Sequence, residues 1–262
     1  MTRPYLTREH PLRLAHRGSR VLWPENTMTA FQGAVDLGYA YIETDVHVTR
    51  DGRVVVFHDD RLERLTDGTG RVWEWRWEDL RRLDAAHHFD PDGGYPSRGR
   101  AIGIPLFEEA LSTFPGVHFN IDLKQRDIEQ AVADEVARFG AGDRVLIGSF
   151  HGVRIKRFRE ITGGAVATSA GPIEVAGALA AARLGRPVPG KADALQVPER
   201  QGPVRVATER FIAAAHRANK QVHVWTVNES AAMHRLLDRG VDGIVTDRPD
   251  LLDEVVAERE RS

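Results

Sequence analysis

Acidic side chains occupy alternate positions in the segment YIETDVHV, residues 41–48. On a β-strand, residues two apart project from the same face, so Glu43, Asp45 and His47 are expected to point in one direction. Two carboxylates that close repel each other, and burying both without a counter-charge raises one pKa or destabilises the fold. We therefore expect one divalent cation, and oxygen ligands favour Mg²⁺ or Ca²⁺ over Zn²⁺. An edge strand whose acids pair with arginines or face solvent is the alternative.

A histidine ends the apolar run that follows this strand. Asp51-Gly52 favours a tight turn, and the apolar run VVVF is expected to form a second extended segment. His58 follows directly at the end of that segment, beside the acids. An imidazole changes charge near neutral pH, which suits general acid or base catalysis at the edge of a metal site. A His-Asp pair alone is common, so the interpretation of His58 depends on its neighbours.

Two further segments contribute cations. RLAHRG ends in His16 and Arg17, and an arginine can bind phosphate oxygens in a bidentate manner, while Gly18 permits a close approach of the backbone. FNIDLK places Asp122 and Lys124 on one strand face, which adds an oxygen ligand and a second cation for phosphate. Two histidines, three carboxylates, an arginine and a lysine suit metal-assisted phosphoryl transfer.

These residues need a scaffold that brings strand ends together. Short β-branched segments alternate with helical patterns, which is typical of a parallel sheet. Eight such segments predict a (β/α)₈ TIM barrel, an α/β fold of about 250 residues whose active sites lie where the strands end. A doubly wound open sheet is the alternative, and the lack of G-x-G-x-x-G after the first strand disfavours it modestly. The eight segments are RLAHRG, YIETDVHV, VHFNIDLK, RVLIGSF, GAVATS, DALQVP, QVHVWTV and DGIVTD.

Residues 61–103 interrupt the alternation. They are rich in turn-forming residues and carry Trp73, Trp75 and Trp77 at alternate positions. We interpret them as a small insertion after the second strand region, packed over one barrel end within a single domain of residues 1–262. The tryptophans are expected to form a strand face or a hydrophobic lid, or simply to pack.

The composition limits the partners. Lys and Arg (36) nearly balance Asp and Glu (38), which argues against a nucleic-acid or anionic-membrane surface. The lack of cysteine excludes disulfides, thiolate chemistry and sulfur-rich metal sites. No run of about eighteen apolar residues occurs, and the first residues lack the apolar stretch of a signal peptide. We expect a cytoplasmic protein without stable membrane insertion, and the sequence carries no signal for its oligomeric state.

The motifs together resemble the glycerophosphodiester phosphodiesterase family. They occur in family order over about residues 12–252 and read AHRGSRVLWPENTMTAF, IETDVHVTRDGRVVVFHDDRLERLTDGTG, IPLFEEAL, NIDLK, Ser149-Phe150, VHVWTVN and GVDGIVTDRPD. The resemblance implies a (β/α)₈ barrel with a small insertion at residues 61–103. It also implies hydrolysis of a small-molecule glycerophosphodiester to glycerol 3-phosphate and an alcohol, with either the glycerol 2-hydroxyl or water as nucleophile.

The resemblance further implies roles for individual residues. They are the catalytic histidines His16 and His58, the phosphate-binding cations Arg17 and Lys124, the substrate-pocket aromatic Trp225, and the metal-binding carboxylates Glu43, Asp45 and Asp122. Asp122 stands where the family usually has glutamate, one methylene longer, so a water could separate it from the metal. Position 47 usually holds another polar residue, so the family gives no support for metal binding by His47.

Three other functions remain open on these residues. A lysophospholipase D-like phosphodiesterase would use the same site and accept a long acyl chain against the tryptophan-bearing insertion. A glycosidase on the same barrel would need two carboxylates flanking the scissile bond, and no set of histidines and cations. A catalytically silent barrel that binds a sugar phosphate or a metal would keep the residues without the reaction.

Overall fold

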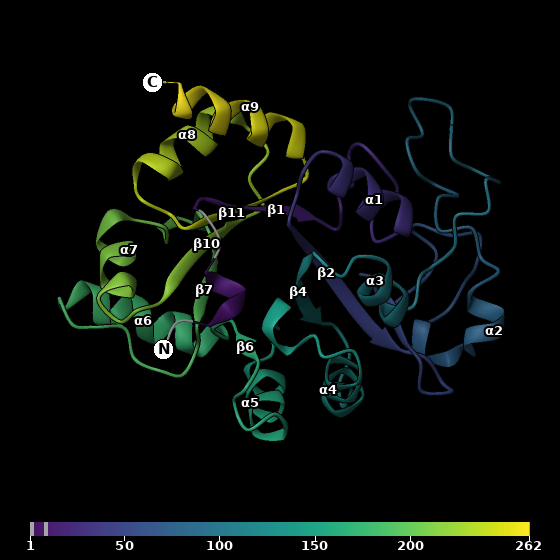
Figure 1. The fold of residues 1–262 in the computed structure, drawn as a ribbon, viewed down its shortest axis with the longest axis horizontal. Helices are drawn as coiled ribbons and strands as arrows, with labels where there is room; N and C mark the ends of the chain where they lie inside the picture. The colour runs from purple at the N-terminus through teal and green to yellow at the C-terminus, as the bar shows by residue number, and fades with distance from the viewer. Residues whose placement is uncertain (1–2, 8–9, 262) are drawn as a thin grey trace.

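The computed structural model describes residues 3–7 and 10–261, and its centre is a parallel sheet (Figure 1). Within those residues the barrel strands follow the order β6-β5-β4-β2-β1-β11-β10-β7. They are β1 (Leu12–His16), β2 (Tyr41–Val48), β4 (His118–Leu123), β5 (Val145–Gly148), β6 (Ala167–Thr168), β7 (Ala194–Pro198), β10 (Gln221–Trp225) and β11 (Gly243–Thr246). Seven of the eight predicted segments contain a whole strand, and RLAHRG contains all of β1 except Leu12.

The two ends of this order meet at a short seam. An isolated parallel bridge pairs Ser169, directly after β6, with Ala194 of β7. The Ala170 N–H donates to the Ala194 carbonyl at 2.9 Å, and the Asp193 N–H donates to the Thr168 carbonyl at 2.8 Å. The sheet is thus a nearly closed barrel with its weakest pairing between β6 and β7, and the predicted (β/α)₈ fold is confirmed.

Helices follow the barrel strands and lie around the sheet (Figure 1). They are α1 (Met28–Asp36), α3 (Phe107–Thr113), α4 (Glu129–Arg138), α5 (Gly152–Ile161), α6 (Pro172–Arg183), α7 (Glu209–His216), α8 (Ser230–Asp238) and α9 (Pro249–Glu260). Shorter elements are β3 (Val54–Val56), α2 (Trp77–Leu80), the hairpin β8 (Arg200–Gln201) and β9 (Val204–Arg205), and the 3₁₀ helices η1 (Pro4–Leu6), η2 (Val72–Glu74) and η3 (Gly142–Arg144). Among the described helices, none combines the length and apolar composition that a membrane span requires.

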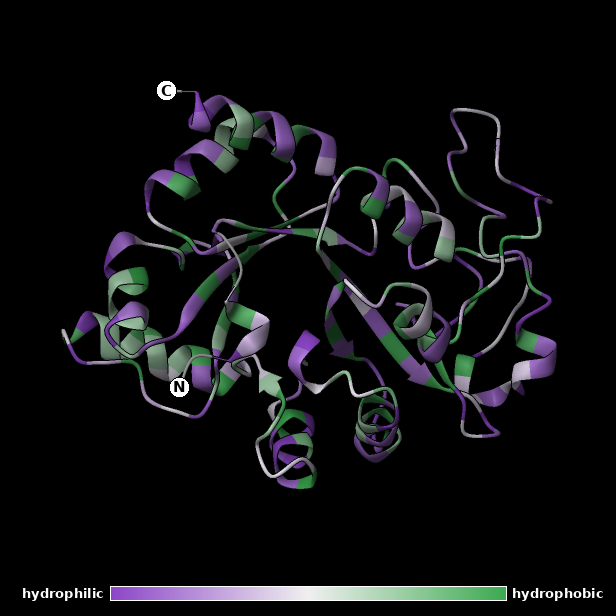
Figure 2. Ribbon diagram, in the orientation of Figure 1, coloured by the Kyte–Doolittle hydropathy of each residue, from purple (hydrophilic) through white to green (hydrophobic). Residues whose placement is uncertain are grey.

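Apolar side chains fill the N-terminal end of the barrel. Tyr5 of η1 packs with Leu12, Leu14 and Tyr41, and the Tyr41 hydroxyl donates to the Tyr5 carbonyl at 2.6 Å. Figure 2 shows hydrophobic segments along the strands and hydrophilic segments on α8 and α9. Because this end is filled, a ligand must enter the barrel from the C-terminal ends of its strands.

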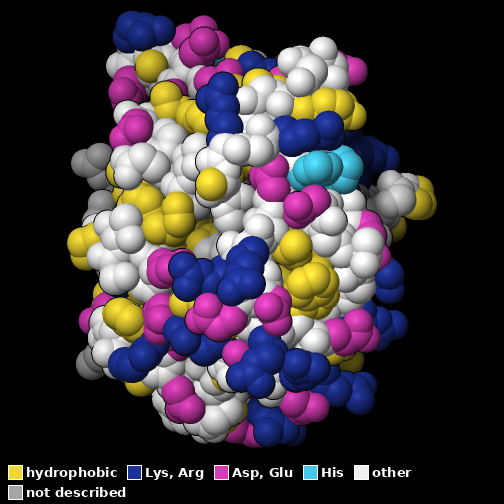
Figure 3. Space-filling view, turned by 90° about the vertical axis from the view of Figure 1, so that its right-hand side faces the viewer, with side chains coloured by type: hydrophobic (Ala, Val, Ile, Leu, Met, Phe, Trp, Pro, Cys, Tyr) yellow, Lys and Arg dark blue, Asp and Glu magenta, His cyan; other side chains and the backbone are white. Residues whose placement is uncertain are grey.

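The β2–β3 hairpin carries the insertion. The two strands are antiparallel, with Val46 opposite Val56, as the tight turn predicts. Residues 61–103 pack beside this hairpin, and Trp77 is buried there among apolar side chains that include Val55 and Leu80. The tryptophans form no strand face, because η2 and α2 occupy this stretch. Figure 3, which faces this side of the molecule, shows positive and negative side chains interspersed on the surface.

Candidate active site

A pocket of about 780 Å³ opens where the barrel strands end. All eight residues assigned from the family resemblance line it: His16, Arg17, Glu43, Asp45, His58, Asp122, Lys124 and Trp225. The pocket also contains polar residues that the sequence reasoning gave no role, namely Arg20, Asn120, Gln196, Asn228 and Asp247. The structure therefore brings together side chains that lie more than two hundred residues apart in sequence.

The loop after β1 holds Arg17 in an uncommon backbone conformation. Arg17 and Asn26 have positive φ angles of 54° and 56°, values that L-residues rarely adopt. The Arg17 N–H donates to the Glu43 carbonyl at 2.8 Å, and its own carbonyl accepts from the Asn26 N–H at 2.9 Å. Gly18 has φ +80°, and a Cβ there would lie 2.7 Å from the Ala30 backbone. The close approach that this glycine permits is thus an approach to α1.

The carboxylates of β2 and β4 lie in register. Asp45 pairs with Asp122, and Glu43 pairs with Asn120 on the neighbouring strand. The Lys124 ammonium lies between two of these groups, 2.9 Å from Asp45 Oδ1 and 2.7 Å from Asp122 Oδ2. Burial by itself would lower the pKa of Lys124, but these two carboxylates outweigh it and raise that pKa. Lys124 therefore remains a cation inside the pocket.

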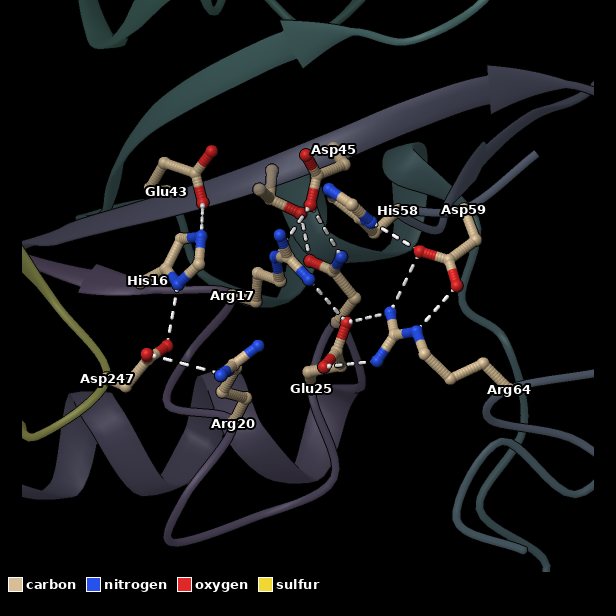
Figure 4. A network of polar contacts seen from close by, with 12 residues as sticks. His16, Arg17, Arg20, Glu25, Glu43, Asp45, His58, Asp59, Arg64 and Asp247 are labelled. Carbon is tan, nitrogen blue, oxygen red and sulfur yellow. Dashed lines mark hydrogen bonds and ion pairs between the residues drawn. The ribbon is translucent and has the colours of Figure 1, made fainter. Parts of the chain in front are cut away.

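Arg17 is the second cation beside Asp45 (Figure 4). Its Nη1 donates to Glu25 Oε1 at 2.7 Å, and its Nε lies 3.2 Å from Asp45 Oδ2. Asn26 Nδ2 also donates to Asp45 Oδ2, at 2.9 Å. Burial would raise the pKa of Asp45, yet Lys124 and Arg17 hold it well below its ordinary value. Asp45 is thus an ionised anchor for both cations.

His16 is oriented by a carboxylate from the last strand region. Its Nδ1 lies 2.6 Å from Asp247 Oδ1, while its Nε2 lies 3.7 Å from Glu43 Oε2. The second Asp247 oxygen accepts from Asn228 Nδ2 at 2.8 Å and lies 3.2 Å from Arg20 Nε. Burial would lower the pKa of His16, but Glu43 and Asp247 outweigh it and raise that pKa. The geometry leaves Nε2 as the ring nitrogen available to a ligand.

His58 has a similar arrangement on the other side of Arg17 and Asp45 (Figure 4). Its Nδ1 lies 2.5 Å from Asp59 Oδ1. Arg64, from the insertion, donates from Nε to Asp59 Oδ2 at 2.5 Å and from Nη2 to Glu25 Oε1 at 2.8 Å. The insertion therefore reaches the site through one arginine that ties the His58 segment to the loop after β1.

Glu43 and Asp122 each retain an oxygen that accepts no hydrogen bond. Glu43 Oε2, Asp122 Oδ1 and the neighbouring Asn120 Oδ1 are all buried in this state. Burial, reinforced by the charge of Asp45, raises the pKa of Glu43. Buried carboxyl and amide oxygens without hydrogen-bond donors form a hard donor set, and that set fits Mg²⁺ or Ca²⁺.

The site also holds more carboxyl groups than arginine and lysine side chains. Carboxylates outnumber cations among the contacting groups, which are Glu25, Glu43, Asp45, Asp59, Asp122 and Asp247 against Arg17, Arg20, Arg64 and Lys124. In residues 3–7 and 10–261, no three His, Cys, Asp or Glu side chains form a ready-made metal cluster.

The insertion does not cover the pocket. None of the described residues 61–103 lines it, so the tryptophans form no lid over it, and packing is the expected alternative that the structure shows. Trp73 instead lies beside His47, with ring centroids 5.9 Å apart, and His47 is buried outside the pocket. The apolar wall of the pocket comes from elsewhere, chiefly from Phe150, Trp225 and one face of α6.

Among the site residues to which the sequence gave no role, Asp247 and Arg64 were missed for different reasons. Asp247 stands at the end of the eighth predicted strand, where barrel active sites lie, so its position was a usable signal. Arg64 lies in an irregular insertion, where neither periodicity nor spacing predicts which side chain turns toward the barrel. Asn26, from the loop after β1, supports the site through its bond to Asp45.

Comparisons with known proteins identify the family of the chain. The model of the glycerophosphoryl diester phosphodiesterase family matches residues 16–251. A protein of Mycobacterium tuberculosis named "Probable glycerophosphodiester phosphodiesterase 2" is 39% identical over 256 residues, which cover 94% of this chain and 90% of that protein. A glycerophosphodiester phosphodiesterase of Bacillus altitudinis is 34% identical over 250 residues, covering 90% of this chain and 94% of that protein.

A solved structure shares the fold. The phosphodiesterase of Oleispira antarctica, in complex with the product sn-glycerol-3-phosphate, superposes with a TM-score of 0.76 at 23% identity, over 94% of this chain and 97% of that chain. The family match spans nearly the whole barrel and contains every polar side chain described above. The chain therefore belongs to the glycerophosphoryl diester phosphodiesterase family.

Proposed function

We propose that this chain is a divalent-metal-assisted glycerophosphodiester phosphodiesterase in which His16 and His58 act as general acid and base. The observation that carries the proposal is the pairing of each histidine with its own carboxylate on either side of two cations, all in one pocket. In each pair Nδ1 lies against a carboxylate, which favours a proton on Nδ1. Nε2 is then the ring nitrogen that faces the ligand. Family membership and the names of the relatives support the same reaction class.

The cations of the site are suited to a phosphodiester. The substrate phosphate carries one negative charge, and further charge develops on its oxygens as the nucleophile attacks. Arg17 and Lys124 already lie at Asp45, so both cations stand at the site before substrate binds and stabilise that charge. Asp45 thus acts as their positioning residue.

The two histidines divide the proton transfers. One takes a proton from the attacking hydroxyl, either of water or of the substrate glycerol, as the new P–O bond forms. The other gives a proton to the oxygen of the alcohol as its bond to phosphorus breaks. A direct attack by water yields glycerol 3-phosphate and the alcohol in one displacement, and a cyclic phosphate formed by the glycerol hydroxyl yields the same products after a water opens it.

The metal of this proposal is Mg²⁺ or Ca²⁺. Glu43, Asp122 and Asp45 would hold it, and the buried oxygens of Glu43 and Asp122 that accept no hydrogen bond support this assignment. When bound, such an ion supplies a Lewis acid that polarises the phosphate and binds hydroxyl oxygens. For Asp45, the same role requires one oxygen to exchange its contact with Lys124.

The test is a product assay on small substrates. Glycerol 3-phosphate is the product to measure, since the Oleispira antarctica relative was solved with it. Its release from glycerophosphocholine and glycerophosphoethanolamine should require Mg²⁺ or Ca²⁺, should stop with excess chelator and should be abolished by Glu43→Ala. No release by the folded protein under any metal would contradict the proposal and would leave the silent binding barrel as the alternative.

A further inference from the structure

The pocket has a polar half and an apolar half. The charged groups come from β1, β2, β4 and the segments that follow them, whereas α6 lines the opposite side with an apolar stripe. That stripe consists of Pro172, Val175, Ala176 and Leu179, whose spacing places them on one helix face. The phosphodiester chemistry described above makes no use of this half.

The position of the stripe follows from the seam of the barrel. β6 has two residues and meets β7 at the Ser169–Ala194 bridge, so little sheet separates the pocket from α6. Pro198 and Val206, from β7 and the segment after the β8–β9 hairpin, complete the apolar lining. We call the region formed by Pro172, Val175, Ala176, Leu179, Pro198 and Val206 the α6 pouch.

Two aromatic side chains connect the pouch to the charged half. The rings of Phe150 and Trp225 meet edge to face with centroids 5.5 Å apart. The Lys124 ammonium lies 5.6 Å from the centroid of Phe150. Phe150 is therefore a boundary between the phosphate-binding cation and the apolar lining, so a molecule bound at Lys124 can extend directly into the pouch.

Apolar side chains also continue beyond the pouch onto the rim. Phe150 is 60% exposed, Val153 80% and Ile173 88%. The two segments that carry them touch, because a Cβ added at Gly171 would lie 2.9 Å from the Gly152 Cα. Adjacent exposed apolar residues at the edge of a pocket mark a place for an apolar ligand. A chain longer than the pouch would meet this rim as it leaves.

The size and charge of the pouch limit its occupant. None of the six side chains that define it is charged, so it offers no counter-ion to an ionic headgroup. The whole pocket, about 780 Å³, lies toward the upper end of the roughly 300–1,000 Å³ of pockets for drug-sized ligands. A glycerophosphodiester with a small headgroup would leave the apolar half filled with water.

We propose that the α6 pouch binds the aliphatic chain of a single-chain phospholipid while the charged half binds its phosphodiester. The inference rests on the proposed function and names its substrate class as 1-acyl-glycerophosphodiesters. In the reaction a water oxygen bonds to phosphorus, the bond from phosphorus to the headgroup oxygen breaks, and a proton joins that oxygen. For 1-acyl-glycerophosphocholine the products are choline and the 1-acyl-glycerol phosphate.

The test compares substrates that share one headgroup and differ only in the chain. Choline release is measured for glycerophosphocholine and for its hexanoyl, octanoyl and decanoyl 1-acyl esters, all below their micelle concentrations and with Mg²⁺ or Ca²⁺. Each methylene buried in the pouch should raise kcat/KM by about threefold to fourfold until the chain reaches the rim. A flat dependence on chain length, with glycerophosphocholine hydrolysed, overturns the inference and leaves the proposed function standing.

Variants on α6 locate the effect. Ala176→Phe fills the pouch, and Leu179→Gln makes it polar. Each variant should reduce the ratio of kcat/KM for the decanoyl ester to kcat/KM for glycerophosphocholine at least tenfold, since each methylene excluded from the pouch loses about a threefold to fourfold gain. Leu184→Phe places an aromatic side chain on an exposed position directly after α6, two turns beyond Ala176 and outside the pocket, and should leave the ratio unchanged. Thermal melts identify any variant that fails to fold. An unchanged ratio in both folded pouch variants overturns the inference, and hydrolysis of neither substrate class by the wild type refutes the proposed function together with it.

Discussion

Replacing Asp247 by asparagine should test how the orientation of His16 affects turnover, because the variant keeps the His16 side chain and changes only its carboxylate partner. The two side chains have the same shape, but an amide has one acceptor and one donor where the carboxylate has two acceptors. In the structure Asp247 Oδ1 faces His16 Nδ1, and Oδ2 faces two donors, Asn228 Nδ2 and Arg20 Nε. The amide of the variant can satisfy only one of these sides.

Either orientation of the asparagine weakens the hold on His16. If its oxygen faces the two donors, its NH₂ group faces Nδ1 and favours the tautomer with the proton on Nε2, the wrong one for a base. If its oxygen faces Nδ1, the charge-assisted hydrogen bond between His16 and residue 247 becomes a neutral one. The NH₂ group of the variant then faces the NH₂ group of Asn228, and neither can accept from the other. A hydrogen bond to a charged group contributes about 1.5–3 kcal/mol, so turnover should fall by about 10- to 140-fold.

The assay is the pH dependence of kcat/KM for glycerophosphocholine, which reports the free enzyme. Because Asp247 helps to raise the pKa of His16, the limb that reports His16 should move to lower pH in Asp247→Asn. Asp250→Asn is the matched control, since Asp250 lies three residues on, outside the pocket, paired with Arg248. Unchanged turnover and an unmoved pH profile in a folded Asp247→Asn protein would refute the orienting role.

Three further predictions concern stability and metal binding. Burial raises the pKa of Glu135 from 4.5 to about 7, so the folded state loses stability as pH rises through that range. Glu135→Gln should therefore raise the free energy of unfolding at pH 8 by up to about 3 kcal/mol and should not change it at pH 4. The control Asp134→Asn, at an exposed position, should give no gain at either pH. Gly18→Ala should lower the free energy of unfolding, measured with denaturant, by several kcal/mol, because it combines a φ of +80° with a backbone clash at 2.7 Å. Gly38→Ala, with φ +86° and open space, should lower it by only about 1–2 kcal/mol. Equal losses in the two variants would exclude the clash. Mg²⁺ or Ca²⁺ should raise the melting temperature of the wild type and much less that of Glu43→Gln, because a cation compensates the buried charge of Glu43; a metal-independent melt would argue against a metal at this position.

The fold and the first shell of the site follow closely from sequence patterns. Parallel strands end at one mouth, so alternate acids on β2 and the Asp122–Lys124 pair on β4 had to converge once the strands were recognised. The turn at Asp51-Gly52 likewise determined that His58 returns beside those acids. The alternation of residues along each strand, together with the rule that parallel barrel strands end at one mouth, was sufficient to predict that these residues converge.

Other contacts depend on packing that no local pattern records. His16 and Asp247 lie 231 positions apart, and their contact follows from the pairing of β1 with β11, the first and last barrel strands. Trp73, Trp75 and Trp77 alternate as strand residues do, but a 3₁₀ helix and a short α-helix place them against the hairpin and away from the pocket. The apolar wall comes from α6 because β6 is short, and strand length is poorly determined by residue propensity.

The most direct test of the central claim is the turnover of glycerophosphocholine by His16→Ala and His58→Ala, each compared with the wild type under identical metal conditions. General acid or base catalysis contributes about 10²- to 10⁴-fold, so each folded variant should lose activity by that factor while retaining the wild-type melting temperature. Near-normal turnover in either folded variant would contradict the account and remove that histidine from the mechanism.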